Sequence, residues 1–452
     1  NDNKSFLGTE PIGKLLMKLA LPTVAAQLIN MLYNIVDRIY IGHIPGDGAL
    51  ALTGVGVCMP IIMIVSAFAA LVGNGGAPRA TIYMGKKDND TAERILGNCF
   101  TAQIIISAVL TMVLLIWNRD LLLAFGASEN TIDYAVAYMN IYAFGTVFVQ
   151  ITLGMNLFIT AQGFAKTGML SVLLGAVTNI ILDPILIFGF HMGVRGAATA
   201  TVISQGLSAF FALRFLSGQK AILRLNPKEF YLNRRLTKEI TTMGISGFTL
   251  AATNGAVQIV CNAQLQQFGG DLYIGVMTIL NSVRDILTMP VTGITNGAQP
   301  VLGFNYGAGH PKRVKSGIKF MTISCLCYTA LAWGCVVLFP EIFIHIFNGS
   351  KDLMKAAVPA LHIYFFGFIF MTLQFSGQAT FVALGKAKQA TFFSIFRKII
   401  IVVPLAMFLP YVGNLGVNGV FLSEPISNFI GGLASFTTMI ITVWRKLEKN
   451  GK

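Results

Sequence analysis

Four acidic side chains inside long apolar stretches are the residues of this chain best suited to chemistry. They are Asp37, Asp183, Asp285 and Glu424. An ionisable side chain within a membrane-spanning helix costs about 2.5–3.5 kcal/mol on insertion scales, so such residues are functional candidates. Two carboxylates close together cannot both be ionised cheaply, which suits a proton carrier. With amide and hydroxyl oxygens beside them, they also suit Na⁺.

The polar neighbours of Asp37 and Asp183 predict one shared pocket in the outer part of the amino-terminal half. Asp37 and Asp183 lie at similar depth near the outer ends of two spans. Asn179 precedes Asp183 by one helical turn, and Thr201 enters from the outer end of the next span. The alternative is structural: Asp37 pairs with Arg38 or caps its span, and Asp183 bonds locally. One face of the first span continues the polar stripe with Gln27, Asn30 and Asn34.

The elements that carry these residues are membrane-spanning helices. Of the 452 residues, 54% are hydrophobic and only 12% are charged, against roughly a quarter charged in soluble domains. This composition excludes a soluble globular protein. Apolar segments long enough to cross a bilayer predict twelve spans, near residues 12–41, 49–74, 92–117, 132–159, 166–189, 194–217, 239–266, 272–300, 314–339, 353–382, 388–411 and 414–444.

The positive charge lies in short loops. The net charge is +14, and the basic residues gather in alternate connections, so we expect no nucleic-acid partner. The positive-inside rule then places both termini in the cytoplasm of a multi-pass protein of the cell (inner or plasma) membrane. The basic stretch over 218–238 is the predicted cytoplasmic linker between two lobes, 1–217 and 239–452.

An internal duplication relates these lobes. Residues 74–87 align with 296–309 at an offset of 222, and residues 192–205 align with 415–428 at an offset of 223. An offset close to six spans is even, so both halves insert in the same orientation, as in transporters with parallel repeats. At an offset of 224, Asp37 aligns with Cys261, and by the neighbouring prolines Asp183 aligns near Val403. We therefore expect coupling ions to use the amino-terminal lobe.

Several ordered motifs resemble the multidrug and toxic compound extrusion (MATE) family, in particular its MepA-like and DinF-like branches. The motifs are YNIVD ending at Asp37, TNIILDPILIFG at 178–189, QPVLGFNYGAG at 299–309 and SEPISN at 423–428. The resemblance implies an all-α polytopic fold of twelve transmembrane helices, in two pseudo-symmetric six-helix lobes around a central cleft. It also implies cation-driven efflux of amphipathic, mainly cationic, organic compounds.

The resemblance also assigns roles to residues. Asp37, Asn179, Asp183 and Thr201 match the coupling-cation site of the family. Pro22 interrupts the first span and removes one helical hydrogen bond. As a family inference, it is a hinge at which protonation bends the helix; the alternative is a static kink. Amides and acids in the spans are the candidates for the substrate cleft: Gln27, Asn30, Asn34, Asn156, Asn254, Gln258, Asp285 and Glu424.

A charged cluster distinguishes the carboxy-terminal lobe. Arg284 and Asp285 lie in the eighth predicted span, Arg397 and Lys398 in the eleventh, and Glu424 in the twelfth at the position that corresponds to Thr201. One interpretation is a structural network, because charges inside a membrane usually pair. The other is that Glu424 or Asp285 contacts a cationic substrate in the cleft.

We therefore predict an antiporter that exports organic molecules by alternating access, with H⁺ favoured over Na⁺. The alternative on the same fold is a flippase of a lipid-linked precursor or an exporter of an anionic metabolite. A channel explains acids in one lobe poorly. The five histidines form no metal-binding or catalytic pattern, so we expect no enzyme, cofactor or resident metal. The expected partners are small organic molecules and the lipid bilayer, around a monomer.

Overall fold

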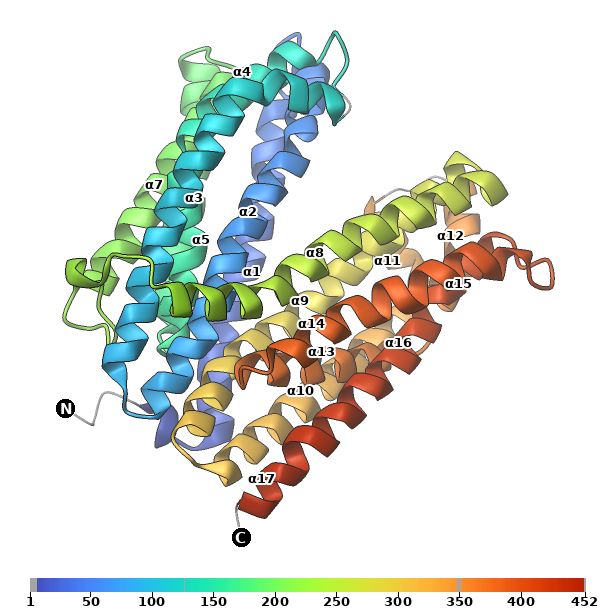
Figure 1. The fold of residues 1–452 in the computed structure, drawn as a ribbon. Helices are drawn as coiled ribbons and strands as arrows, with labels where there is room; N and C mark the ends of the chain where they lie inside the picture. Colours follow the sequence, from blue (N-terminus) through green and yellow to red (C-terminus); the bar gives the residue numbers. More distant parts are fainter. Residues whose placement is uncertain (1–5, 126, 348–350, 451–452) are drawn as a thin grey trace. The chain divides into compact units, whose positions relative to one another are not determined.

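The fold is helical throughout the part of the chain that the structure describes. This structure, a computed structural model, describes residues 6–125, 127–347 and 351–450 (Figure 1). Within these ranges every regular element is a helix, and no strand occurs. Nine of the described helices are long and apolar enough to cross a membrane, and eleven spans result when two bent pairs each count as one. The predicted all-α membrane fold is confirmed.

The first half of the chain contains six predicted spans, and each is a helix or a pair of helices. Their bounds are α1 (Ile12–Gly42), α2 (Gly48–Gly85), α3 (Asn89–Ala124), α4 (Ile132–Phe144) with α5 (Thr146–Ala161), α6 (Ala165–Pro184) with the π-helical segment η3 (Ile185–Gly189), and α7 (Val194–Ser217). Two short turns, η2 (Phe6–Gly8) and η4 (Pro227–Glu229), lie outside the spans.

The second half repeats this order. Its elements are α8 (Arg234–Gly269), α9 (Asp271–Gly307), α10 (Pro311–Leu338), α11 (Pro340–Phe347), α12 (Lys351–Tyr364) with α13 (Phe368–Ala383), α14 (Ala387–Ile395), η5 (Phe396–Val402), α15 (Val403–Phe408), η6 (Leu409–Tyr411), α16 (Val417–Met439), η7 (Ile440–Trp444) and α17 (Arg445–Asn450). Helix α8 is long enough to span but is not among the apolar set. It begins with charged residues and carries Asn254 and Gln258 in its middle.

The backbone reproduces the sequence duplication. Gly193 has φ 59° and ψ −129°, and Gly416, 223 residues later, has φ 55° and ψ −127°. His191 and Asn414, at the same offset, also have positive φ, 53° and 57°. Left-handed backbone is unfavourable outside glycine, so its recurrence at matched positions shows that both halves make the same turn. Other matched positive-φ pairs are Gly46 with Gly270 and Gly163 with Gly385.

The bent pairs recur as well. Helices α4 and α5 meet at an angle of 58°, and α12 and α13 meet at 53°. The residue between α4 and α5 is Gly145, and its counterpart at an offset of 222 is Gly367, which precedes α13. Each lobe therefore has one span that is broken at a glycine, although the hydropathy of the sequence is continuous across both breaks.

The chain forms two compact units. One consists mainly of Leu21–Gly244, and the other of Leu7–Ala20 with Ile245–Lys452. Helices α1 and α8 therefore each begin in one unit and continue in the other. The two boundaries, after Ala20 and after Gly244, are 224 residues apart, which is the offset that aligns these helices in the sequence.

Reciprocal contacts attach the starts of α1 and α8. In the second unit, Arg313 Nη2 donates to the carbonyl oxygens of Leu7 (3.1 Å) and Glu10 (2.7 Å). In the first unit, the Asn98 side-chain oxygen accepts from the backbone N–H of Asn233 at 2.7 Å, just before α8. The Gly75 backbone of α2 lies so close to Ile240 of α8 that a Cβ there would lie 2.1 Å from the Ile240 oxygen.

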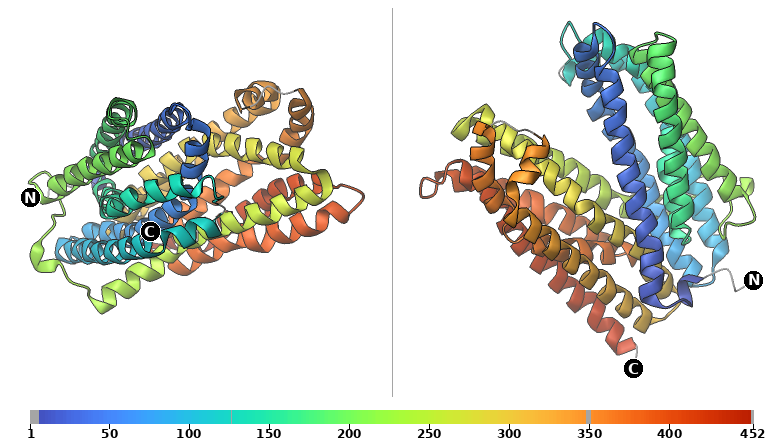
Figure 2. Two further views of the ribbon diagram at one scale, coloured as in Figure 1. Left: turned by 90° about the horizontal axis from the view of Figure 1, so that it is seen from above. Right: turned by 180° about the vertical axis from the view of Figure 1, so that it is seen from behind.

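Glycines also allow close helix packing inside each unit, whose helices are drawn from two further sides in Figure 2. A Cβ on Gly73 of α2 would lie 3.3 Å from the Gly154 backbone of α5, and a Cβ on Gly432 of α16 would lie 2.2 Å from the Phe370 oxygen of α13. Small residues at helix contacts are typical of membrane bundles, where close backbone approach replaces the hydrophobic driving force. Each unit thus forms a tightly packed bundle that fixes the positions of its buried polar side chains.

Candidate functional site

The structure brings Asp37 of α1 and Asp183 of α6 together in the first unit. Asp37 is 9% exposed and Asp183 is fully buried. The Asp37 carboxyl interacts with the side chains of both Asp183 and Asn179. Asn179 Nδ2 donates to Asp183 Oδ2 at 3.2 Å. Asn179 and Asp183 are four residues apart on α6, so both side chains reach the same face towards α1.

The oxygens of this carboxylate pair are only partly used. One oxygen each of Asp37, Asn179 and Asp183 is buried without a hydrogen-bond partner. Within the described residues neither carboxylate forms an ion pair, and Arg38, the next residue along the chain, is exposed. Buried polar atoms normally have partners. Three unpartnered acceptor oxygens on side chains that contact one another, with no ion-pair partner among the described residues, are expected of a site for a proton or a small metal cation.

Two tyrosines lie beside the pair, and each has a further polar partner. Tyr33, one turn before Asp37 on α1, is close to both carboxylates and shares a hydrogen bond with Gln205. Tyr138 of α4 is near Asp37 and shares a hydrogen bond with Thr201. Sequence analysis missed these three residues. The four-residue spacing of Tyr33 and Asp37, and that of Thr201 and Gln205, was available as a signal, whereas nothing in the sequence marks Tyr138.

Thr201 is connected to Asp37 through one intervening side chain. Its Oγ1 donates to the Ala197 carbonyl of its own helix at 3.0 Å, and its link to Asp37 runs through Tyr138. Pro184 follows Asp183 directly and leads into the π-helical segment η3. A π-helical turn often marks a functional site, because the widened turn redirects side chains. This local distortion accompanies the inward position of Asp183.

The other predicted cleft residues lie on exposed helix faces. Asn30 and Asn34 are exposed on α1 of the first unit, and Gln27 is half-buried there. Asn254 and Gln258 are exposed on α8 of the second unit. Amides on the surface of a spanning helix are more favourable towards water than towards lipid. Their assignment to a substrate cleft stays a prediction.

Asn156 and Pro22 have distinct settings. Asn156 is half-buried on α5, its Oδ1 has no hydrogen-bond partner, and it would lie 3.1 Å from a Cβ on Gly168 of α6. It therefore faces the interior of the first unit.

Pro22 is inside α1, two residues after the boundary between the units. The position is compatible with a hinge, and its movement stays a prediction.

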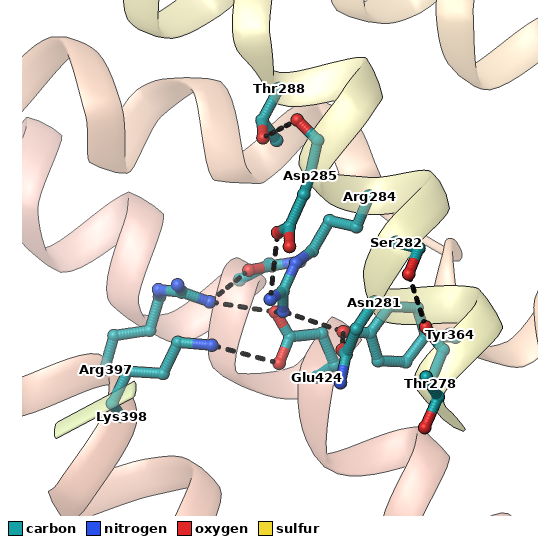
Figure 3. A network of polar contacts seen from close by, with 11 residues as sticks. Thr278, Asn281, Ser282, Arg284, Asp285, Thr288, Tyr364, Arg397, Lys398 and Glu424 are labelled. Carbon is teal, nitrogen blue, oxygen red and sulfur yellow. Dashed lines mark hydrogen bonds and ion pairs between the residues drawn. The ribbon is translucent and has the colours of Figure 1, made fainter. Parts of the chain in front are cut away.

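The charged residues of the second unit form one network around Glu424 (Figure 3). Glu424 Oε1 accepts from Arg284 Nη1 and Arg397 Nη1, both at 3.1 Å, and Lys398 Nζ lies 3.6 Å from Glu424 Oε2. Glu424 is 5% exposed. Asp285 contacts Arg284 Nη2 at 3.5 Å but is 68% exposed. The structure thus joins all five cluster residues, and Glu424 is fully engaged by cations.

Neutral side chains complete this network. Arg284 Nη1 also donates to the Tyr364 hydroxyl at 2.7 Å, and that hydroxyl donates to Asn281 Oδ1 at 2.7 Å. Arg397 Nη1 donates to Asn428 Oδ1 at 2.9 Å. Tyr364 and Asn428 carry no charge and gave no signal in the sequence.

A π-helical segment explains how two successive residues reach one carboxylate. Arg397 and Lys398 lie in η5, just before Pro404. In an α-helix neighbouring side chains point about 100° apart, whereas the wider π turn reduces this angle. The corresponding span of the first unit has its π segment at η3, beside the matched Pro184. Both units therefore have a π-helical segment near the matched proline, after it in the first unit and before it in the second.

Two helical bundles related by an internal repeat, each with buried ionisable side chains, define a two-lobed, multi-pass membrane transporter. The sequence profile of the MatE family matches residues 22–185 and 248–408. The chain therefore belongs to the MATE family of multidrug efflux transporters, as its motifs predicted, and it is a transporter of small molecules and not an enzyme.

Known relatives cover almost the whole chain. The protein named Multidrug export protein MepA of Staphylococcus haemolyticus is 24% identical over 422 residues, 93% of this chain and 92% of that protein. A solved structure described as MATE in the bent conformation superposes with a TM-score of 0.93 at 20% identity, covering 100% of this chain and 99% of that one. A structure described as an outward-facing MATE family transporter gives 0.90 at 21% identity, covering 99% of each chain.

Proposed function

We propose that this transporter exports amphipathic organic compounds in exchange for protons that bind between Asp37 and Asp183. The observation that carries the proposal is the buried pair of carboxylates, which together with Asn179 has three unpartnered oxygens and forms no ion pair within the described residues. Two adjacent carboxylates in an apolar bundle favour one shared proton. Na⁺ is the alternative ion, because Asn179 and the carboxylates offer oxygens to it.

Proton binding and substrate binding must favour opposite conformations for exchange to occur. A ligand shifts a conformational equilibrium only through its different affinity for the two states. In this proposal proton binding lowers the negative charge of the pair and stabilises the state that releases substrate outside. Pro22 lies about four turns before Asp37 on the same helix, where α1 lacks one backbone hydrogen bond and bends cheaply.

The charge of the exported compound is a separate part of the proposal. The family resemblance favours cationic compounds. The second unit favours an acidic group on them, because Glu424 is already paired with three cations. A flippase for an acidic lipid-linked precursor is the second candidate function on the same observation. We further propose a monomer in the cell membrane, without a nucleic-acid partner and with both termini in the cytoplasm.

Gradient-driven transport in liposomes tests the coupling ion. Efflux of a rhodamine with a free carboxylate, and of its methyl ester, would be measured under a pH gradient and, separately, a sodium gradient. We expect the pH gradient alone to drive efflux, and Asp37→Asn and Asp183→Asn to abolish it. Asp133→Asn is the matched control, because Asp133 of the same unit is 86% exposed.

Each outcome has a clear meaning. Efflux driven by the sodium gradient alone would replace H⁺ by Na⁺ at the same site. Unchanged gradient-driven efflux in both variants would overturn the assignment of the carboxylate pair. The carboxylate pair would also be rejected if Asp133→Asn reduced coupling as much as Asp37→Asn does.

A further inference from the structure

The network around Glu424 has an excess of positive charge. Three cations, Arg284, Arg397 and Lys398, face two carboxylates, and one of those, Asp285, is mostly exposed. In the described residues no other acidic side chain forms an ion pair with the three cations. A network that only supports the fold is expected to balance its charges, because an uncompensated charge in a spanning bundle is costly. This cluster instead retains capacity for one more anion.

Donor atoms for that anion are present. Both hydrogen bonds of Arg397 in the described structure start from Nη1, although a guanidinium carries five N–H groups on three nitrogens. Arg284 Nη2 has only the contact with Asp285, which at 3.5 Å is the longer of the two ion pairs of Arg284. An exposed ion pair of this kind contributes little stability. A ligand oxyanion can therefore exchange with Asp285 at small cost.

The cluster is exposed along α9. Asp285 is 68% exposed and the Arg284 side chain is 19% exposed, whereas Lys398 is 5% exposed. Thr278, Ser282 and Thr288 lie along this part of α9 (Figure 3). Their hydroxyls bond to carbonyls of their own helix. An exposed carboxylate among hydroxyls on a spanning helix faces water, because lipid contact would be strongly unfavourable.

We propose that the basic cluster Arg284–Arg397–Lys398 binds an oxyanion, a carboxylate or a phosphate, carried by the exported compound. The anion replaces Asp285 on Arg284 and uses the remaining donors of Arg397. Glu424 is the resident carboxylate that holds the three cations in place. The inference rests on the proposed function, because it assigns the chemistry of the compound that this transporter moves.

The internal duplication supports a specific role for the cluster. Glu424 corresponds to Thr201, and Asp183 corresponds to a position near Val403, directly after the π-helical segment that carries Arg397 and Lys398. The span that contributes an acid in the first unit therefore contributes two basic residues in the second. If the charges served only the bundle, related spans would carry related residues; the difference in charge indicates two different ligands.

Equilibrium binding tests the proposal without any ion gradient. Binding of the carboxylate rhodamine and of its methyl ester to purified full-length protein in nanodiscs would be measured by fluorescence polarisation. We expect the free carboxylate to bind at least about tenfold more tightly than the ester. Arg284→Gln and Lys398→Gln should remove most of this preference, and Asp285→Asn should increase affinity, since it removes the competing carboxylate.

Controls separate this proposal from the proton site and from misfolding. Lys355→Gln removes an exposed positive charge from the same unit and should preserve the preference. Asp37→Asn should keep the carboxylate preference while gradient-driven efflux is lost. Because Asp285→Asn predicts tighter binding, loss of fold cannot imitate the expected pattern. Benzoate and phenyl phosphate as competitors distinguish a carboxylate from a phosphate ligand.

Two results would overturn the inference. One is equal binding of acid and ester by the parent protein. The other is an acid preference that survives both Arg284→Gln and Lys398→Gln. Failure of gradient-driven transport with the preference intact would reject the proton proposal and leave the anion site standing.

Discussion

Glu424→Gln tests how strongly the second unit depends on one carboxylate. Glu424 is 5% exposed and is the shared partner of Arg284, Arg397 and Lys398 at 3.1–3.6 Å. The amide keeps the shape but removes the negative charge. Two like charges about 5 Å apart repel by about 3 kcal/mol at an effective dielectric of about 20. Removing one partner of a buried ion pair costs about 3–5 kcal/mol, and we expect a loss in this range.

Thermal unfolding in detergent measures this loss. We expect the melting temperature of Glu424→Gln to fall by several degrees. Lys398→Met provides the contrast, because it leaves two arginines against two carboxylates, so we expect it to stay within about 1 kcal/mol of the parent. Glu448→Gln is the control for loss of an exposed pair, since Glu448 lies 3.2 Å from Lys315 and is 54% exposed; it should cost at most about 1 kcal/mol.

The order of the three melting temperatures tests whether Glu424 is the counter-ion of the three cations. If Lys398→Met melts below Glu424→Gln, the cations stabilise the bundle by themselves and the charge excess is not a burden. If Glu424→Gln melts like Glu448→Gln, the buried network contributes no more than a surface pair. Either result would refute the reasoning that makes Glu424 the resident counter-ion.

Two further predictions concern packing and capping. Gly244→Ala would put a Cβ 1.9 Å from the Leu71 carbonyl oxygen, whereas a Cβ at Gly334 meets no atom within 4 Å. In thermal unfolding we expect Gly244→Ala to lose about 1–3 kcal/mol of stability and Gly334→Ala to gain up to about 1 kcal/mol. Equal melting temperatures of the two variants would refute the close contact at Gly244. Asp88 caps α3 by accepting from Thr91 N (3.2 Å) and Thr91 Oγ1 (2.7 Å), which lowers the pKa of this carboxyl below its ordinary value. Its stabilisation is therefore present above the unfolded-state pKa of about 3.9 and is lost as the pH falls through the lower folded-state pKa. Asp88→Ala should melt below the parent at neutral pH and together with it in strong acid, and a pH-independent gap would contradict the capping role.

The sequence predicted the elements well because hydropathy and repetition are signals that a bilayer imposes. The match of residues 192–205 with 415–428 predicted that the two halves repeat, and Gly193 and Gly416 share their backbone angles within a few degrees. The breaks at Gly145 and Gly367 were not predicted. The apolar run continues across each break, and hydropathy registers the length of a span but not its direction.

The residues of the two sites were also predicted only in part. Helical spacing predicted that Asn179 and Asp183 share a face, and the structure shows their hydrogen bond. Tyr138 could not be found, because it approaches Asp37 from α4, far away in the sequence. The convergence of Arg397 and Lys398 on Glu424 was equally inaccessible, since it depends on a π-helical turn that an α-helical projection does not contain.

If the proton and the exported compound bind at separate sites, their exchange is coupled through a conformational change and not through competition for one site. If both ligands shared one carboxylate, as Asp37 would allow for a cationic compound, exchange would follow from mutual exclusion alone. The basic cluster consists of different side chains with the opposite charge, so a proton and an oxyanion do not compete for the same group. Exchange then requires that the protonated pair and the occupied cluster stabilise different states, and the coupling equals the difference of their affinities for those states. Measured proton affinity should therefore change when the carboxylate rhodamine binds, and should stay constant with its ester.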